Sequence, residues 1–123
     1  MDGKRIFAII DVASTGKGIR NNRIIKIGIV RIEDGQIVAR YDSLVNPEQR
    51  IPNYISARTS IDDAMVAEAP TFADIAEKVD DLTKDAIFVA HGVSFVYHVV
   101  RSEFRYLGYN FSREKLCSMR LSK

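Results

Sequence analysis

The feature that most constrains the fold is an Asp-Gly pair, Asp34-Gly35, between two segments rich in β-branched residues. These segments run from Arg23 to Ile32 (RIIKIGIVRI) and from Gln36 to Val45 (QIVARYDSLV). Asp-Gly readily takes the left-handed backbone conformations of a tight turn, so the pattern predicts a β-hairpin. The second and third strands of the domain are therefore expected to be antiparallel.

A further strand is expected before the hairpin. The segment from Lys4 to Asp11 (KRIFAIID) is short, apolar and rich in β-branched residues, which is typical of a strand covered on both faces. Residues 12–22 (VASTGKGIRNN) contain glycine, asparagine, serine and threonine, so we expect a loop there. Three strands thus open the chain.

Helical spacing replaces the strand pattern in the middle of the chain. Capping-box-like starts at Ser60 and Thr71 predict a short helix over about 61–67 and a longer one over about 72–83. The longer segment carries an apolar stripe that would cover one face of a sheet.

Another crossover unit follows. We expect a buried strand over Ala86–Ala90, a helix over about 95–107 that Ser94 caps and Gly108 ends, and a last strand over Leu116–Leu121. An antiparallel meander followed by strand-helix-strand units predicts an α/β fold with a mixed sheet and right-handed crossovers.

Composition fits an ordinary globular domain. The chain has 123 residues, 46% hydrophobic and 28% charged, so we expect one domain, 1–123. The apolar run from Ile6 to Ile10 is far shorter than the roughly 18 residues that a membrane span needs. With a single cysteine, Cys117, a disulfide within the chain is excluded, and we expect a cytoplasmic protein with no membrane contact.

Charge is unevenly distributed along the chain. Residues 1–100 carry a net charge of −2 and residues 101–123 a net charge of +4. A basic end fits contact with a phosphate backbone, but it equally fits a solvated helix face and a polar terminus.

Asp11 is the most informative single residue for function. Sites in open α/β sheets form beyond the carboxyl ends of strands, and Asp11 ends the first apolar run. Its carboxylate could serve a site or accept N–H bonds from its own turn. A phosphate-binding loop at Ser14-Thr15-Gly16-Lys17 is excluded by spacing, because the positions for its first glycine and its hydroxyl are Asp11 and Gly18. Outside this segment, Cys117 and His98 fit packing or surface positions.

Six segments together resemble the DnaQ-like 3′–5′ exonucleases, the family of the DNA polymerase III epsilon subunit. They are FAIIDVASTG, RIIKIGIVRIEDGQIV, LVNPEQRIP, TSIDDAMVAEAPTF, IFVAHGVSFVY and LGYNFSREKLCSMRLS. The resemblance implies a ribonuclease-H-like mixed sheet of five strands, three antiparallel and then two parallel to the first, with flanking helices. Members of this family cleave 3′-terminal phosphodiesters with two Mg²⁺ or Mn²⁺ ions held by four carboxylates, and a histidine acts as general base.

The sequence departs from the family pattern at most of these positions. In the Asp-x-Glu motif Asp11 matches, as do the following Thr15 and Gly16, but the glutamate position is Ala13. In the His-Asn-x-x-Phe-Asp motif His91 and Phe95 match, while Gly92 and Val96 replace the asparagine and the metal-binding aspartate. Lys26 stands where many relatives have an acid, and the third motif and its C-terminal helix would lie beyond residue 123.

These departures imply a domain without catalysis and with weak metal binding or none. Asp11 is the one remaining catalytic and metal-binding candidate, and Thr15, Gly16, His91 and Phe95 are the candidates for weak binding of a single-stranded DNA or RNA 3′ end. The alternative is a non-catalytic module that holds a polymerase or another nuclease domain. A third hypothesis is an active nuclease whose missing ligands come from elsewhere. We also expect self-association through an uncovered sheet face.

Overall fold

The computed structural model describes residues 5–16 and 22–117, and its five described strands form one mixed sheet. The strands are β1 (Ile6–Ser14), β2 (Ile24–Glu33), β3 (Gln36–Leu44), β4 (Ile87–Ala90) and β5 (Lys115–Cys117). The helices are α1 (Asn53–Thr59), α2 (Asp63–Val66), α3 (Phe72–Thr83) and α4 (Val93–Tyr106). The expected α/β class and the expected five-stranded sheet are confirmed.

The sheet has the strand order β3-β2-β1-β4-β5. The pairs β1–β2 and β2–β3 are antiparallel, whereas β1–β4 and β4–β5 are parallel. Asp34 and Gly35 have φ angles of 53° and 84°, so the hairpin turn forms where the Asp-Gly pair predicts it.

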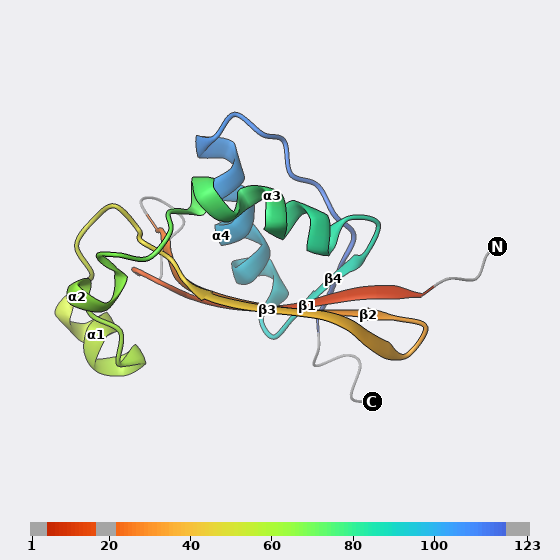
Figure 1. Ribbon diagram of the computed structural model, residues 1–123, viewed down its shortest axis with the longest axis horizontal. Coiled ribbons are helices and arrows are strands. Elements are labelled where there is room, and N and C mark those ends of the chain that lie inside the picture. Colours follow the sequence, from red (N-terminus) through yellow and green to blue (C-terminus); the bar gives the residue numbers. More distant parts are fainter. Residues whose placement is uncertain (1–4, 17–21, 118–123) are drawn as a thin grey trace.

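Helices α3 and α4 lie together on one face of the sheet (Figure 1). They bury the main core against alternate residues of the central strands, among them Ala8, Ile10, Ile27 and Ile29. Four phenylalanine rings are fully buried in this core: Phe72, Phe88, Phe104 and Phe111. The rings of Phe104 and Phe111 stack with centroids 4.6 Å apart.

Helices α1 and α2 lie at one end of the sheet, on the side away from α3 and α4 (Figure 1). The β1–β2 register shifts between Ala13 and Ser14, and a bulge of this kind turns one extra residue toward the other face. Ile25, which lies at the shift, joins a second small core with Ile51, Ile55 and Ile61. The rest of this sheet face is not covered by any described helix.

The helix over 72–83 begins and ends as predicted. Thr71 accepts a hydrogen bond from the Asp74 amide, and the Asp74 carboxylate accepts one from the Thr71 amide, which completes a capping box. The start predicted at Ser60 is wrong, because Ser60 ends the unpredicted helix α1 in a left-handed conformation (φ 64°). Asp62 caps α2 instead, and its side chain accepts from the Met65 amide.

Two further boundaries differ from the sequence prediction. Gly92, in a left-handed conformation (φ 67°), precedes α4, and the side chain of Ser94 does not cap the helix. Strand β1 continues to Ser14, because Val12 and Ala13 pair with β2 instead of entering a loop. Asp11 therefore lies within the strand and not at its end. The predicted last strand is confirmed at Leu116 and Cys117, and its remaining residues lie outside the described residues.

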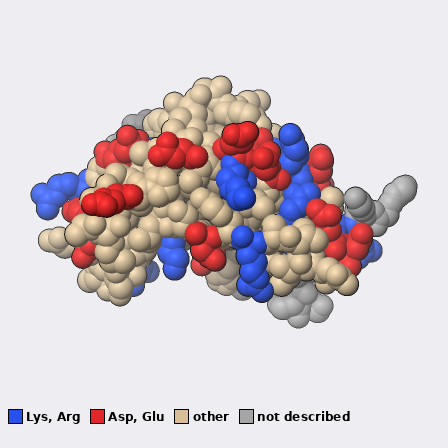
Figure 2. All heavy atoms as spheres, in the orientation of Figure 1, with Lys and Arg blue, Asp and Glu red and all other residues tan. Residues whose placement is uncertain are grey.

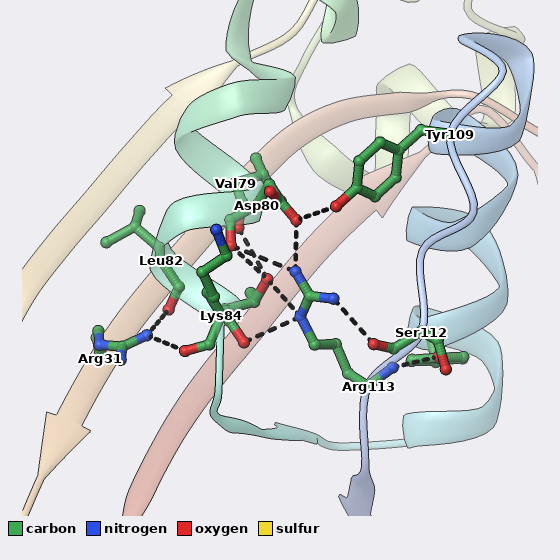
Figure 3. Close-up of polar contacts among 10 residues, drawn as sticks. Arg31, Val79, Asp80, Leu82, Lys84, Tyr109, Ser112 and Arg113 are labelled. Atoms are coloured by element: carbon green, nitrogen blue, oxygen red, sulfur yellow. Dashed lines mark hydrogen bonds and ion pairs between the residues drawn. The ribbon is translucent and has the colours of Figure 1, made fainter.

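A polar network fastens the segment before β5 to the end of α3 (Figure 3). The Arg113 guanidinium forms an ion pair with Asp80 and donates to the Thr83 carbonyl at 3.0 Å. Tyr109 donates its hydroxyl hydrogen to the same Asp80 carboxylate at 2.9 Å. The network fixes the chain as it returns from α4 to the sheet.

Among the residues that the structure describes, no helix is long and apolar enough to cross a membrane.

Candidate functional site

A groove of about 650 Å³ lies on the uncovered face of the sheet. Because side chains alternate along a strand, residues two apart on β1, β2 and β3 form its floor. The connection between α1 and α2 forms a wall. The residues that line the groove include Ile9, Asp11, Ala13, Lys26, Gly28, Val30, Asp42, Leu44, Ile61 and Met65. The structure thus places Asp11 in this groove.

Two rows of paired residues cross the groove floor. Asp11 pairs with Gly28, which in turn pairs with Asp42. The next row on the same face is Ala13, Lys26 and Leu44. Lys26 is therefore the diagonal neighbour of both carboxylates, within the roughly 7–8 Å that long side chains span between strands.

Gly28 leaves room for the Asp42 carboxylate. A Cβ at position 28 would lie only 2.8 Å from Asp42 Oδ1. The carboxylate therefore lies over the glycine, in the middle of the groove floor. Sequence reasoning missed both residues. If the hairpin paired without interruption from its two-residue turn, Gly28 would lie opposite Tyr41. The register shift between Arg31 and Ile32 brings Asp42 opposite Gly28 instead.

Asp11 and Asp42 are both exposed carboxylates. Neither has a hydrogen-bond or ion-pair partner among the residues that the structure describes. The alternative in which Asp11 accepts N–H bonds from its own turn is wrong, since Asp11 lies inside β1 and is not in a turn. Its carboxylate is free to meet a ligand from solvent.

Thr15 and Gly16 lie beyond the groove, after the end of β1. Thr15 is 4% exposed, and its hydroxyl accepts hydrogen bonds from the Arg23 amide at 3.0 Å and from Gln49 Nε2 at 2.9 Å. The Gly16 amide donates to Asn22 Oδ1 at 3.1 Å, and Asn22 Nδ2 donates back to the Gly16 carbonyl at 3.0 Å. These contacts hold the two ends of the β1–β2 connection together.

A buried ion pair ties this connection to α4. Glu103, 1% exposed, accepts from Arg23 Nε at 3.0 Å and from the Ile24 amide at 2.8 Å. Burial alone would lower the pKa of Arg23, but the hydrogen bond and the negative charge of Glu103 outweigh it and raise the pKa. Sequence analysis missed this pair, because its residues are 80 positions apart.

His91 and Phe95 lie near the carboxyl end of β4 and do not line the groove. In the parallel pairing of β1 with β4, Ile9 lies opposite Val89. Asp11 follows Ile9 by two residues, and His91 follows Val89 by two residues. His91 is exposed, and Phe95 in the first turn of α4 is 39% exposed. Val96, by contrast, packs into the main core with 7% exposure.

The donor set does not fit a pair of divalent ions. No group of three or more His, Cys, Asp or Glu side chains that could hold a metal occurs in the described part of the chain. Ala13 and Val96 offer no ligand atoms, and Lys26 adds positive charge beside Asp11. Hard divalent ions need several oxygen ligands, which these positions do not supply.

The basic C-terminal region is partly used inside the fold. Arg113 pairs with Asp80, and the Lys115 ammonium lies 4.4 Å from the centroid of the Tyr97 ring. Figure 2 shows acidic and basic side chains interspersed on the face in view, without a large area of one sign. Two of the basic residues counted from the sequence, Arg120 and Lys123, lie outside the described residues.

Comparison with known proteins decides the family. The family RNase_T, described as exonuclease, matches residues 8–123. The chain belongs to this exonuclease family. The DnaQ-like resemblance read from the six sequence segments is thereby confirmed.

Several named exonucleases are similar to this family member. It is 32% identical over 114 residues to a protein of Staphylococcus epidermidis named 3′-5′ exonuclease DinG, covering 93% of this chain and 13% of that protein. The DinG protein of Staphylococcus aureus is 37% identical over 103 residues, with coverages of 84% and 12%. The chain thus spans about an eighth of the length of these relatives.

Solved structures of exonucleases share the fold. Exonuclease X in complex with 5′ overhanging duplex DNA superposes with a TM-score of 0.72 at 29% identity, covering 94% of this chain and 61% of that one. Escherichia coli Exonuclease I in complex with a dA16 oligonucleotide has a TM-score of 0.83 at 13% identity, with coverages of 96% and 29%. The latter likeness concerns the fold alone.

Proposed function

We propose that this exonuclease-family domain does not hydrolyse phosphodiesters with its own residues. The observation that carries the proposal is the packing of Val96 in the apolar core, because the sequence resemblance sets Val96 at the position of a metal-binding aspartate. Ala13 also supports the proposal. The resemblance sets Ala13 at the position of the glutamate in the first family motif, and Ala13 pairs with Lys26 of β2. Losing carboxylates while keeping apolar packing preserves the fold and removes the metal site.

Metal titration tests the proposal without reference to activity. A single exposed carboxylate, Asp11, with Asp42 on the far side of Gly28, is expected to bind Mn²⁺ no better than the millimolar range of weak sites. Calorimetric titration with Mn²⁺ and with Mg²⁺ should show no micromolar event. Micromolar binding that Asp11→Asn abolishes would refute the proposal, and would support the hypothesis that the missing ligands come from elsewhere.

Nucleic-acid binding by the domain is proposed to be weak and confined to a single-stranded DNA or RNA 3′ end. Its support is the exposed ring of Phe95, since exposed aromatic rings can stack on bases. Fluorescence anisotropy of a labelled oligonucleotide, measured across salt concentrations, tests it. Phe95→Ala should weaken binding, whereas Tyr54→Ala, at a 56% exposed aromatic residue of α1, should not.

A second candidate function is a protein-interaction module that holds a polymerase or another nuclease domain. The observation that favours it is the uncovered sheet face, which combines exposed apolar side chains with charges. Absence of salt-dependent oligonucleotide binding would favour this function over the first. Self-association through the same face is expected to show as a concentration-dependent mass in light scattering.

A further inference from the structure

Residues 47–69 leave the main core and return to it at one place. This segment carries α1 and α2 at one end of the sheet (Figure 1). Val45 and Phe72, which flank it, are buried in the main core with 0% and 1% exposure. The Asn46 amide donates to the Pro70 carbonyl at 2.8 Å, which holds the two ends of the segment together. The segment can therefore separate from the sheet without displacing β3 or α3.

The segment has a small hydrophobic core of its own. Ile51, Ile55, Ile61 and Val66 are buried together, with exposures between 3% and 5%. In the described part of the chain, this cluster and the main core share no residue. The Asp63 carboxylate accepts a hydrogen bond from the Ile51 amide at 2.9 Å and ties the start of the segment to α2. Contacts of this kind form and break together, so the segment should be cooperative.

Three contacts attach the segment to the strands beside it. The sheet contributes Ile25, with 0% exposure, to the core of the segment. Gln49 Nε2 donates to the Thr15 hydroxyl at 2.9 Å. Arg23 and Glu48 lie 3.8 Å apart, but the Glu48 side chain is 58% exposed, so this ion pair stabilises little. The attachment thus relies mainly on one apolar side chain and one hydrogen bond.

Two residues of the segment have left-handed backbone conformations. Glu48 has a φ angle of 59° and Ser60 one of 64°, a region that side chains with a Cβ rarely adopt. Glu48 lies near the start of the segment, and Ser60 lies between α1 and α2. Opening of the segment relaxes both residues, which favours the open form.

The segment also forms the wall of the groove that contains Asp11. Thr59, Ser60, Ile61 and Met65 line the groove from this side, whereas Asp11 lies on the strand that forms part of its floor. Opening of the segment would therefore remove the wall and leave the floor in place.

We propose that residues 47–69 open by local unfolding as one cooperative unit, while the sheet, α3 and α4 stay folded. The groove over Asp11 then has a fixed floor and a wall that opens and closes. The inference concerns the motion of the chain alone, so it stands or falls independently of catalysis and of nucleic-acid binding.

Hydrogen exchange of the full chain, followed by NMR at rising sub-denaturing urea concentrations, tests the proposal. The Ser60 and Ala69 amides, which are hydrogen-bonded within the segment, should share one opening constant. This constant should exceed that of the Ile27 and Ile29 amides of β2 by about tenfold or more. Its urea dependence should be shallower, because local opening exposes less surface than global unfolding.

Two matched variants separate local from global opening. Ile55 in α1 and Ile75 in α3 are both buried helical isoleucines, with 4% and 6% exposure. Ile55→Ala should speed exchange of the segment amides by about tenfold or more, because it leaves a cavity in the core of the segment. Ile75→Ala should speed exchange of the β2 amides and leave the opening constant of the segment unchanged, since the main core stays packed in the open form.

Three outcomes would overturn the inference. The first is a segment that exchanges with the same opening constant and urea dependence as β2, which would mean that it opens only when the whole chain unfolds. The second is an equal acceleration of the segment and β2 amides by Ile75→Ala. The third is unrelated opening constants for Ser60 and Ala69, which would mean that α1 and α2 fray separately. The urea dependence of the unaltered chain decides the question even where a variant fails to fold.

Discussion

Val96 keeps only 7% of its surface exposed, and the sequence resemblance sets it at the position of a family aspartate. It contributes to the same core as Phe72 and Val100, so its side chain now stabilises the fold. The sequence could predict the replacement itself, because the motif spacing from His91 fixes the position. It could not predict the burial, which depends on how the first turn of α4 rotates after Gly92.

Restoring the family acid at this position should therefore cost stability. Val96→Asp is expected to lower the free energy of unfolding by about 3 kcal/mol, because it buries a carboxyl group among apolar side chains. Urea denaturation measures this. Ser94→Asp, at an exposed position in the same helical turn, is the control and should change stability by less than about 0.5 kcal/mol. Equal effects of the two variants would show that position 96 can face solvent.

Glu103 is the residue whose role sequence reasoning missed altogether. It lies on the inner side of α4, where a helical pattern would place an apolar residue, and it pairs with Arg23 across 80 positions of sequence. No local pattern reveals such a partner, because the contact exists only once α4 packs on the sheet.

Breaking this pair should destabilise the chain more than breaking an exposed one. Glu103→Gln is expected to lower the free energy of unfolding by about 3 kcal/mol, since it leaves the Arg23 guanidinium without its buried counter-charge. Glu48→Gln, which removes the 3.8 Å ion pair between Arg23 and a 58% exposed side chain, should cost less than about 0.5 kcal/mol. Thermal unfolding of both variants checks the contrast, and similar losses would contradict it.

At the scale of elements, the strands and α3 were predictable because their signals are local. The Asp-Gly turn, the apolar runs and the Thr71 capping box each lie within a few residues of sequence. Helix α1 was missed because its sequence, NYISART, is short and mostly polar and buries only Ile55. The extension of β1 to Ser14 depends on pairing with β2, which local composition does not reveal.

The start of α4 offers a test at this scale. Gly92 has a positive φ of 67°, a conformation that costs most L-residues about 1 kcal/mol. Gly92→Ala is therefore expected to lower stability by about that amount. Gly92→Asn, which restores the family residue, should cost less, because asparagine tolerates this conformation. Denaturant midpoints of the two variants decide it, and a larger loss for asparagine would contradict the backbone explanation.

At the scale of the whole molecule, the family and its sheet could be read from the sequence, but the groove could not. The groove depends on which residues of three strands share one face, and two register shifts set that alignment. The β2–β3 register shift places Asp42 in the groove. His91 and Phe95 are not among the residues that line it. The sheet has the fold of an exonuclease, and among the described residues no group of three or more side chains that could hold a metal occurs.

The central claim is that this exonuclease fold does not perform exonuclease chemistry with its own residues. A 3′-labelled single-stranded oligonucleotide incubated with the chain and Mg²⁺ or Mn²⁺ tests it most directly. We expect no shortening above a buffer control, with Asp11→Ala indistinguishable from the unaltered chain. Shortening well above the control that Asp11→Ala abolishes would contradict the claim.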